Sequence, residues 1–495
     1  MGASGGLSRR KVLGLGIGVA AAAAVSACGA GAGAGAGGPV GPTSPAVASF
    51  AAAQRRRFPN GRLVEHVLDA APGMVDIGGL SSTGWFYGGV LPGPLLRVVV
   101  GDRLRVRVRN GLPDPTTVHW HGIAIRNDMD GVEGVTQPPI AGGQGFTYEF
   151  VVPDPGTYWY HSHGDLQRGR GLYGALIVDD PAEAGGYDVE FTVVLSDWLT
   201  DQTPRQVFDQ LRHSGMGSMN GMSGMSSPLL GGDAGDVRYP VYLMGGRQPS
   251  VPITLSAGPG QRARIRLINA SDDTAFRVAL GGHQLSVTHS DGRAVTPTTG
   301  DAVLITMGER YDVQVTLADG VFPLVADTEG KNGRAFGLVR TAPATAPSSN
   351  VNPTELSGRV LTVADLSATA SDRLPAKAPD VTLTGVLGGG MAQYDWTING
   401  RAYPASQALP VHQGQRVRLT YTNNTMMYHP MHLHGHTFAI ARPDGTGPRK
   451  DTVAVLPGHS VGLDFDTDNP GQWFTHCHNE YHLAAGMATI VSYRT

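Results

Sequence analysis

The sequence predicts an all-β protein, and two observations support this prediction. Glycine and proline are abundant, with 70 and 34 of the 495 residues, and no long amphipathic helical pattern follows the N-terminal segment. Short runs instead alternate polar and apolar residues between Gly, Asp and Asn turns, as strands with one buried face do. These runs span residues 95–110, 262–270, 309–320 and 415–424.

One strand pattern recurs three times along the chain. In residues 92–112 and 409–425 a Gly-Asp or Gly-Gln turn leads into an alternating strand that ends at Asn, shortly before a histidine cluster. Residues 259–271 have the same strand but no cluster after it. We interpret the pattern as one β-sandwich repeated three times, with metal chemistry in the outer two. The expected limits are 59–182 for the first domain, 183–342 for the second, 343–378 for a linker and 379–495 for the third.

The N-terminus is predicted to be an export signal, residues 1–28, and not part of the fold. SRRKVL (8–13) precedes about 15 mostly apolar residues, too few for a comfortable membrane span. The arginine pair resembles a twin-arginine signal, although the usual phenylalanine is replaced, so the general secretory route stays open. VSAC (25–28) resembles a bacterial lipobox, and the alternative is a cleaved signal with an incidental cysteine.

These features predict an exported protein of the cell envelope. We expect a lipid on Cys28 to anchor it to the outer side of the cytoplasmic membrane, as its only membrane contact, with residues 29–58 as a flexible tether. If Cys28 is lipidated or removed, Cys477 is the only cysteine left and no intramolecular disulfide can form. The net charge of −3 and the lack of a basic patch give no indication of nucleic-acid binding.

Histidines in the outer two domains form a repeated motif. Residues i and i+2 of a strand point to the same face, so a His-x-His pair can hold one metal or two adjacent ones. One such pair is more often structural, but several in separate clusters predict a metal centre. The pairs are His119/His121, His161/His163, His432/His434, His434/His436 and His476/His478.

The segment HCHNEYHLAAGM (476–487) predicts two metal sites at once. On a strand, His476 and His478 face one side and Cys477 faces the other. His482 and Met487 follow the cysteine with C-x4-H-x4-M spacing. A thiolate, imidazoles and a weak thioether are the ligands of an electron-transfer copper. His429 is the natural candidate for the second imidazole, and the Cys-His peptide would then link that copper to the other metals.

Four motifs, in order, resemble those of the three-domain multicopper oxidases, which include laccases, ferroxidases and bacterial cuprous oxidases. They are HWHG (119–122), HSHG (161–164), HPMHLHG (429–435) and HCHNEYHLAAGM (476–487). The resemblance extends from about residue 60 to the C-terminus. It implies three cupredoxin-like Greek-key β-sandwiches, four copper ions (one type 1, one type 2 and two type 3) and a mostly monomeric state.

Further segments are similar to the lipid-anchored copper-resistance oxidases of high-GC bacteria. Besides the lipobox they are RNDMDG (126–131), PDPGTYWYHSH (153–163) and TMMYHPMHLHGHTF (425–438).

Carried over by position, the resemblance assigns every copper ligand. The type 1 copper would take His429, Cys477, His482 and Met487. The type 2 copper would take His119 and His432. The type 3 pair would take His121, His161, His163, His434, His476 and His478. The other seven histidines are expected on the surface or in cores, with His436 as a candidate partner of a ligating ring.

The resemblance also implies the reaction. Four one-electron oxidations at the type 1 copper would reduce O2 to two waters, which requires protons from nearby carboxylates. Asp130 has the position of the family's acidic residue, and its alternative role is a turn residue before Gly131. A second acid of some bacterial members is Leu483 here, which leaves Glu480 as a weaker candidate.

The reducing substrate is suggested by methionines. Met216, Met219, Met222 and Met225 recur at intervals of three among Gly and Ser, in residues 213–227. Thioethers prefer Cu(I), so we interpret this segment as a cuprous-ion collector, against the alternative of a low-complexity surface loop. Met427 is either a Cu(I) ligand on the way to the type 1 site or a core methionine.

The sequence therefore predicts a cuprous oxidase that detoxifies copper, with O2 as the oxidant and Fe(II) or small phenols as lesser reductants. One alternative is a laccase-like phenol oxidase with an organic natural substrate. A non-enzymatic alternative is a copper-binding envelope protein or scaffold, which is disfavoured because no ligand of the motifs is missing. A two-domain nitrite-reductase-like enzyme is disfavoured further, because the chain carries a third domain and the full type 3 set.

Overall fold

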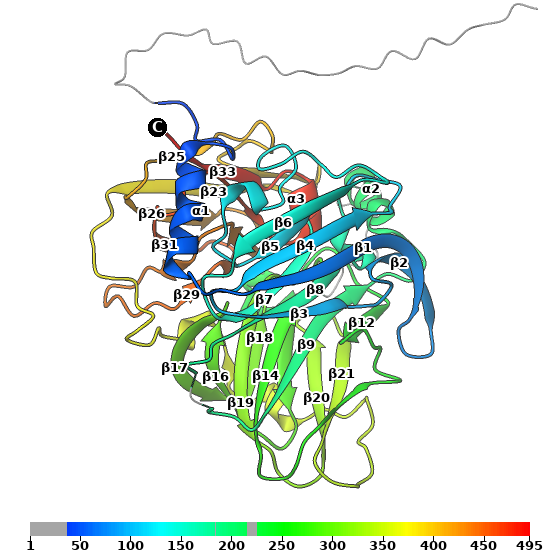
Figure 1. The fold of residues 1–495 in the computed structure, drawn as a ribbon. Coiled ribbons are helices and arrows are strands. Elements are labelled where there is room, and N and C mark those ends of the chain that lie inside the picture. Colours follow the sequence, from blue (N-terminus) through cyan, green and yellow to red (C-terminus); the bar gives the residue numbers. More distant parts are fainter. Residues whose placement is uncertain (1–36, 184, 215–224) are drawn as a thin grey trace, which may run out of the picture. The chain divides into compact units, whose positions relative to one another are not determined.

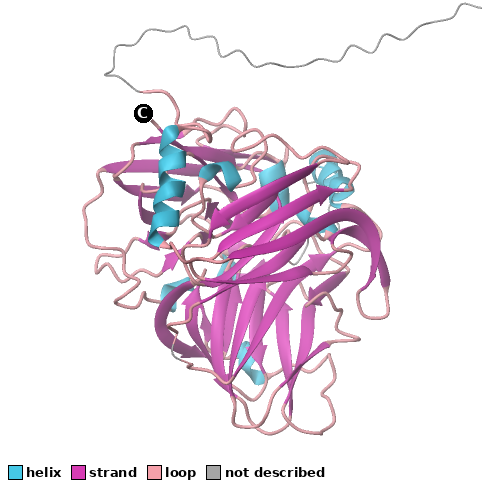
Figure 2. Ribbon diagram, in the orientation of Figure 1, coloured by secondary structure: helices cyan, strands magenta, loops and turns pink. Residues whose placement is uncertain are grey.

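The structure, a computed structural model, describes residues 37–183, 185–214 and 225–495. Strands dominate this part of the chain (Figures 1 and 2), and the predicted all-β class is confirmed. None of the helices in these ranges is long and apolar enough to span a bilayer. The strands form three two-sheet sandwiches in chain order and one small hairpin.

The first sandwich packs two four-stranded sheets face to face. One sheet has the order β2-β1-β4-β6, with β1 (Leu63–Asp76), β2 (Ser81–Tyr87), β4 (Arg103–Asn110) and β6 (Gly145–Val151). The other has the order β3-β8-β7-β5, with β3 (Gly93–Val99), β5 (Val118–His121), β7 (Gly156–Ser162) and β8 (Tyr173–Asp179). In β4 the alternation of the sequence sends Leu104, Val106 and Val108 into the core and the arginines outward, as expected for a half-buried strand.

The second sandwich has two six-stranded sheets and contains no predicted ligand. The order of the first sheet is β12-β9-β14-β19-β16-β17 and that of the second is β13-β21-β20-β15-β18-β22. The first consists of β9 (Val189–Trp198), β12 (Val241–Met244), β14 (Arg262–Asn269), β16 (Leu285–Ser290), β17 (Arg293–Gly300) and β19 (Arg310–Thr316). The second consists of β13 (Ile253–Ser256), β15 (Phe276–Leu280), β18 (Ala302–Ile305), β20 (Val321–Thr328), β21 (Arg334–Arg340) and β22 (Val360–Leu361).

The third sandwich pairs a six-stranded sheet, β24-β23-β26-β31-β28-β29, with a five-stranded sheet, β25-β33-β32-β27-β30. The first consists of β23 (Val381–Gly390), β24 (Asp395–Ile398), β26 (Arg416–Asn423), β28 (Phe438–Ile440), β29 (Arg449–Lys450) and β31 (Ser460–Asp466). The second consists of β25 (Leu409–Val411), β27 (His429–Leu433), β30 (Thr452–Val455), β32 (Gln472–Cys477) and β33 (Ala488–Tyr493). The hairpin is β10 (Ser226–Ser227) with β11 (Gly232–Asp233).

The three strands of the repeated pattern occupy equivalent places. β4, β14 and β26 each pair in parallel with an earlier strand, namely β1, β9 and β23. Each also pairs antiparallel with a later one, namely β6, β19 and β31. The same neighbours in the same directions agree with the internal repeat that the sequence predicts. The exact domain limits stay a prediction.

Helices are few and short, and one of them corrects an expectation. α1 (Pro45–Arg57) lies inside the predicted flexible tether, so that prediction is wrong for these 13 residues. Ser44 caps the helix by accepting the N–H of Val47, proline stands at its start, and Val47 and Ala51 are buried. The α1 ribbon is seen in dark blue in Figure 1. The other α-helices are α2 (Pro204–Ser214) and α3 (Glu480–Ala484).

Part of the predicted linker is also ordered into the fold. Within residues 343–378, β22 pairs in parallel with β18 and so extends a sheet of the second sandwich.

Short 3-10 helices occur both inside and outside the predicted linker. They are η1 (Asn127–Met129), η2 (Arg168–Arg170), η4 (Pro228–Leu230), η5 (Thr354–Ser357) and η6 (Val363–Asp365).

The histidine motifs meet where the first and third sandwiches face each other. β5 and β7 carry the motifs of the first sandwich, and their register places His119 opposite His161. β27 and β32 carry those of the third, with His432 opposite His476 and Met431 opposite Cys477. Pairing between strands therefore brings the two motifs within each sandwich side by side. Only the packing of the first sandwich against the third brings the four motifs together.

Candidate metal centre

The end of β32 serves two sites, as the alternation of a strand requires. His476 and Cys477 are its last residues, and both are buried. Nε2 of His476 lies 3.1 Å from Nε2 of His434. Sγ of Cys477, on the other side of the strand, lies 3.6 Å from Nδ1 of His429 and 3.5 Å from Nδ1 of His482. Two adjacent residues thus face two separate groups of side chains.

The cysteine side is a compact sulfur and nitrogen site. The two Nδ1 atoms of His429 and His482 are 3.0 Å apart, close enough to share one metal ion with the thiol. Met487 is fully buried, and its carbonyl accepts the N–H of Cys477 at 3.0 Å. The indole of Trp396 packs against the His482 ring, with centroids 4.3 Å apart. Three ligand atoms of the predicted type 1 set therefore converge, namely the thiol sulfur of Cys477 and the Nδ1 atoms of His429 and His482. The backbone of Met487, the fourth predicted ligand, is hydrogen-bonded to that of Cys477.

His482 is held from behind by a carboxylate that the sequence analysis missed. Nε2 of His482 lies 2.9 Å from Oδ2 of Asp236, and the hydroxyl of Tyr394 donates to the same oxygen at 2.6 Å. A proton on Nε2 leaves Nδ1 free for a metal. Burial opposes protonation, but the hydrogen bond and charge of Asp236, with a contribution from Cys477, raise the pKa of His482 to about 10, so a metal that binds Nδ1 must displace a proton.

The histidine side brings rings from both outer sandwiches together. Nε2 of His119 lies 3.4 Å from Nε2 of His432, which joins the first sandwich to the third. Ligand atoms lie within 4.8 Å of one another in four groups. These groups are His119/His432/His434, His119/His121/His161, His163/His434/His476 and His121/His432/Asp451.

Three of the nitrogens that face this pocket lack protein partners, which is the pattern of a metal site. Within the described ranges, Nδ1 of His121 and the Nε2 atoms of His161 and His163 are buried and accept or donate no hydrogen bond. Buried polar atoms without partners are rare in proteins, and a metal ion satisfies them. The residues present therefore fit copper, the ion that imidazole and thiolate ligands suit.

Hydrogen bonds behind the rings set which nitrogen faces the pocket. Most of the rings bind an oxygen through Nδ1 and so present Nε2. These pairs are His119 with the carbonyl of Asp130 at 2.9 Å, His161 with that of Ser162 at 2.8 Å, His432 with that of Asp451 at 2.9 Å, His476 with that of Cys477 at 2.8 Å and His434 with the carboxylate of Asp130 at 2.9 Å. His121 is reversed, because its Nε2 lies 3.0 Å from the carboxylate of Asp451.

Burial favours the neutral form, which is the form that binds metal, at eight of the predicted ligand histidines. Desolvation is the largest cause in each case, and the charges of neighbouring rings add to it. The pKa values of His121, His161, His163, His429, His434, His476 and His478 fall well below the ordinary value, and that of His432 falls less.

His478 is the one predicted ligand whose ring nitrogens belong to none of the close groups. Its ring lies near those of His121 and His161, with centroids at 4.9 and 5.5 Å. Nη1 of Arg168 lies 2.9 Å from Nδ1 of His478, and Nη2 donates to the His478 carbonyl at 3.0 Å. No motif in the sequence predicts this buried arginine, which also pairs with Asp272 and Glu480, both at 3.1 Å.

The two candidate proton donors have different surroundings. Asp130 is 1% exposed and contacts His434 directly, at 2.9 Å. Glu480 is 5% exposed and lines a cavity of about 160 Å³ that also contacts His163 and Leu483. Burial raises the pKa of Glu480, although the charge of Arg168 opposes the rise. Asp130 therefore contacts a ring of the histidine group directly, and Glu480 shares a cavity with one.

The methionines divide into two sets. Met216, Met219 and Met222 lie outside the described residues. Met225 is 5% exposed and packs in a cluster with Met307 and Tyr428. Met427 is 1% exposed, two residues before His429, and its backbone bridges to that of Asp233.

The sequence predicts His436 as a candidate partner of a ligating ring. Nδ1 of His436 lies 3.1 Å from the backbone carbonyl of His434, and Nε2 lies 2.7 Å from the hydroxyl of Tyr493. Its contacts are therefore with the backbone and a tyrosine. Asp236, Asp451 and Arg168 belong to no motif, and no signal in the sequence distinguishes them from other charged residues.

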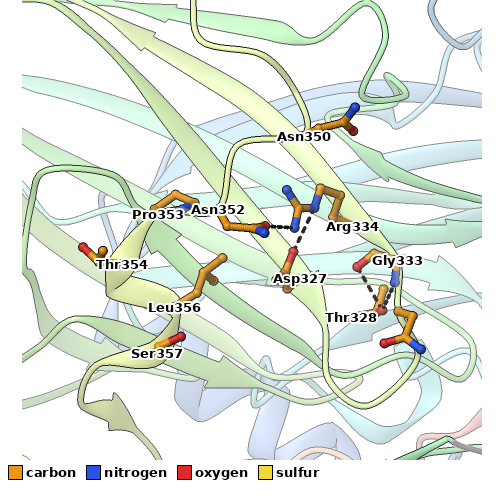
Figure 3. Close-up of a pocket in the computed structure, with 11 residues that line it drawn as sticks. Asp327, Thr328, Gly333, Arg334, Asn350, Asn352, Pro353, Thr354, Leu356 and Ser357 are labelled. Carbon is orange, nitrogen blue, oxygen red and sulfur yellow. Dashed lines mark hydrogen bonds and ion pairs between the residues drawn. The ribbon is translucent and has the colours of Figure 1, made fainter.

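A second hollow, of about 820 Å³, lies on the second sandwich (Figure 3). Asp327, Arg334 and Asn352 line it, and the guanidinium of Arg334 contacts both of the other side chains. No histidine, cysteine or methionine is among its lining residues. This hollow therefore contributes nothing to the metal centre.

The chain belongs to the multicopper oxidase family. Three family models described as multicopper oxidase match it, over residues 71–183, 190–344 and 375–495. As a member of this family the protein takes four copper ions, of types 1, 2 and 3, and couples one-electron oxidation of a reductant to the reduction of O2 to water.

Individual relatives agree with this family. The chain is 50% identical over 455 residues to the multicopper oxidase MmcO of Mycobacterium tuberculosis, covering 90% of each chain. It is 29% identical to a copper resistance protein A homolog of Pseudomonas syringae pv. tomato, covering 83% of this chain and 89% of the relative. Among solved structures, an L499M mutant of the laccase from B. aclada is 26% identical, with a TM-score of 0.75 over 89% of this chain and 90% of that one.

Proposed function

We propose that this multicopper oxidase oxidises Cu(I) in the cell envelope and so detoxifies copper, with Fe(II) and phenols as lesser reductants. The observation that carries the proposal is the carboxylate of Asp236 behind His482, on the cysteine side of the centre. Oδ2 of Asp236 lies 2.9 Å from Nε2 of His482, so the ring that would hold the type 1 copper has an acidic group directly behind it. A carboxylate attracts a cation and not a neutral phenol.

A second acid and two methionines lie in the same part of the chain and support a preference for a soft cation. The backbone of Asp233, three residues before Asp236, bridges to that of Met427, and the backbone carbonyl of Met225 accepts the N–H of Ala234 at 3.4 Å. Burial and then the charge of Asp236 raise the pKa of Asp233, although a backbone N–H opposes the rise. A bound cation relieves that repulsion, and thioethers select Cu(I) over Fe(II). Met216, Met219 and Met222 stay candidates from the sequence alone.

We assign the ligands as the motifs predict. His429, Cys477, His482 and Met487 would hold the type 1 copper, and His119 and His432 the type 2 copper. The type 3 pair would be held by His121, His161, His163, His434, His476 and His478. Copper supplies one-electron redox chemistry at both sites when bound.

The residues of the chain provide the path for electrons and protons. Cys477 is bonded through the backbone to His476 and to His478, so two routes connect the two sites and each crosses a single peptide link. Asp130 contacts His434 and can pass a proton to the pocket, and Glu480 can do so from its cavity. Burial of both sites excludes bulk water, so protons reach O2 only through such groups.

The envelope location rests on the N-terminal segment. We propose a lipid on Cys28 that anchors a monomer to the outer side of the cytoplasmic membrane. In a Cys28→Ser variant the protein should move from the membrane fraction to the soluble fraction with unchanged oxidase activity. If the variant stays with the membrane, the lipid anchor is wrong and another contact holds the protein there.

Steady-state oxygen consumption with Cu(I), Fe(II) and a substituted phenol tests the substrate. Met427→Leu should lower kcat/KM for Cu(I) about tenfold or more, while phenol oxidation should change little because leucine keeps the volume. Equal loss with all three reductants would mean that Met427 is a core residue. A phenol kcat/KM above that of Cu(I) in the parent protein would favour the laccase alternative, and no oxygen uptake with any reductant would favour a binding protein or scaffold.

A further inference from the structure

Arg310 is a buried cation of the second sandwich that lies behind the histidine group. It is the first residue of β19, and its side chain is 0% exposed. Nε donates to the carbonyl of Thr157 on β7 at 3.1 Å, and Nη1 donates to the carbonyl of Gly308 at 3.2 Å. A guanidinium in this position needs a carboxylate, because a buried unpaired charge is strongly unfavourable.

Asp451 is that carboxylate, and it comes from the third sandwich. Nη1 and Nη2 of Arg310 donate to its two oxygens at 2.7 and 2.6 Å, in the parallel two-point geometry that fixes the plane of a carboxylate. The backbone N–H of Asp451 donates to Asp291 at 3.2 Å. Burial opposes ionisation of Asp451, but Arg310 and His121 outweigh it and hold the pKa of Asp451 well below its usual range.

Asp451 contacts two proposed ligands from different sandwiches. One oxygen lies 3.0 Å from Nε2 of His121, and its carbonyl lies 2.9 Å from Nδ1 of His432. The hydroxyl of Thr452 donates to the same carboxylate oxygen at 2.9 Å. An ionised carboxylate only accepts hydrogen bonds, so the proton of a neutral His121 lies on Nε2. Nδ1 of His121 is then the nitrogen left for a metal, and it is buried without a partner in the described chain.

We propose that Arg310 is a positioning residue for the histidine group: its two-point contact holds the Asp451 carboxylate in the orientation that fixes the His121 ring with Nδ1 toward the proposed metal. The inference rests on the ligand assignment proposed above. It gives the second sandwich, which has no ligand of its own, a part in the copper centre. Removal of Arg310 frees the Asp451 side chain to rotate, and the His121 ring loses its fixed orientation. His432 keeps its hydrogen bond to the Asp451 carbonyl and loses only the weaker side-chain contact at 3.5 Å.

The chain contains a matched control for the loss of a buried arginine. Arg266 is 1% exposed, lies on the neighbouring strand β14 and pairs with Asp312 at 3.1 Å and Glu190 at 2.7 Å. Nη1 of Arg266 donates to the hydroxyl of Thr157, the residue whose carbonyl Arg310 contacts. Arg266 contacts none of the proposed ligands in the described structure. Arg266→Gln should therefore reproduce the general cost of breaking a buried ion pair and nothing else.

The test compares the full chain with its Arg310→Gln, Arg310→Lys and Arg266→Gln variants, all loaded with copper. Copper per chain is measured before and after a chelator, together with the paramagnetic resonance of the type 2 copper, the near-ultraviolet band of the type 3 pair and the blue absorption of type 1. Partners behind metal ligands change affinity about ten- to hundredfold.

For Arg310→Gln we expect copper at the histidine group to be released at about ten- to hundredfold lower chelator, with altered resonance and near-ultraviolet spectra and an intact blue band. For Arg310→Lys the chelator concentration that releases copper should lie between those of the parent protein and Arg310→Gln. Lysine keeps the positive charge but cannot make the two-point contact of a guanidinium. Arg266→Gln should lower thermal stability only.

Unchanged spectra and copper content in Arg310→Gln, or equal changes in Arg266→Gln, would overturn the proposal. If Arg310→Gln does not fold, Arg310→Lys and Asp451→Asn must show the altered spectra, and unaltered spectra in both would also overturn it. A parent protein that binds no type 2 or type 3 copper would instead refute the ligand assignment itself.

Discussion

Gly308 offers a sharp test of how tightly the histidine group is packed. Its φ is +86°, in the left-handed region that favours glycine, and it precedes Arg310 by two residues. A Cβ added there would lie 2.9 Å from Cγ and Cδ2 of His478 and 3.2 Å from Cε1 of His121, whereas ordinary contact begins at about 3.4 Å. Gly308→Ala must therefore move the His478 ring by about 0.5 Å.

The expected effect has two parts. The left-handed backbone costs about 1–2 kcal/mol for alanine, which corresponds to a fall of about 2–8 °C in the midpoint of thermal unfolding. Displacement of two proposed ligands adds a loss of about ten- to hundredfold in turnover, since catalytic groups tolerate errors of only about 0.5 Å. Copper content and the near-ultraviolet band should fall, while the blue absorption of the type 1 site, on the other side of β32, should remain.

A matched glycine separates the two parts. Gly282 also has a left-handed backbone, with φ of +75°, but a Cβ there would meet only Phe322, at 3.7 Å. Gly282→Ala should lose similar stability and keep full activity. The reasoning is refuted if Gly308→Ala retains the parent copper content, spectra and turnover, or if both alanine variants lose activity equally.

Three other predictions follow from single contacts. Cys477→Ser should abolish both the blue absorption and oxygen consumption, because the thiolate is the proposed sulfur ligand, and survival of either would remove Cys477 from the type 1 site. Asp236→Asn should keep the blue colour but lower kcat/KM for Cu(I) about ten- to hundredfold, since the carboxylate behind His482 loses its charge; unchanged Cu(I) kinetics would exclude Asp236 from the electron path. The third concerns acid stability: burial raises the pKa of Asp312, but Arg264 and Arg266 outweigh it and lower the value to about 2 from 3.8. This ionisation stabilises the folded state by about 2 kcal/mol above pH 4 and is lost as the pH falls through 2. Asp312→Asn should be less stable at neutral pH and should lose less stability on acidification, measured as the unfolding midpoint between pH 5 and pH 2; parallel pH curves for the two proteins would contradict the assigned pKa.

Local patterns predicted the strands well because alternation records which face of a strand is buried. The runs at 95–110, 262–270 and 415–424 form β3 and β4, β14 and β26, and the repeat that they indicated has the same strand pairing in all three sandwiches. The two-sided use of His476 and Cys477 was also predictable, since adjacent residues of a strand point to opposite faces.

The predictions of a tether and a linker were wrong in part, because they were based on amino-acid composition and not on a periodic pattern. Alanine and polar residues at 45–57 suggested a tether, yet a serine cap and two buried apolar side chains are enough to hold α1 against the fold. Residues 360–361 lie in the predicted linker but pair with β18. Both segments gain their order from contacts with distant residues, which a local reading cannot include.

The sequence by itself determined the fold class, the family and the candidate ligands, because ligand chemistry and strand periodicity are local properties of residue type and spacing. Tertiary structure alone decided which nitrogen of several rings faces the pocket. For His482, His121 and His434 that choice depends on the carboxylates of Asp236, Asp451 and Asp130, and each of these contacts joins residues more than 200 positions apart. Arg310 and Arg168 also acquire their places only when the sandwiches pack, since a buried charge is stable only beside the partner that folding brings to it.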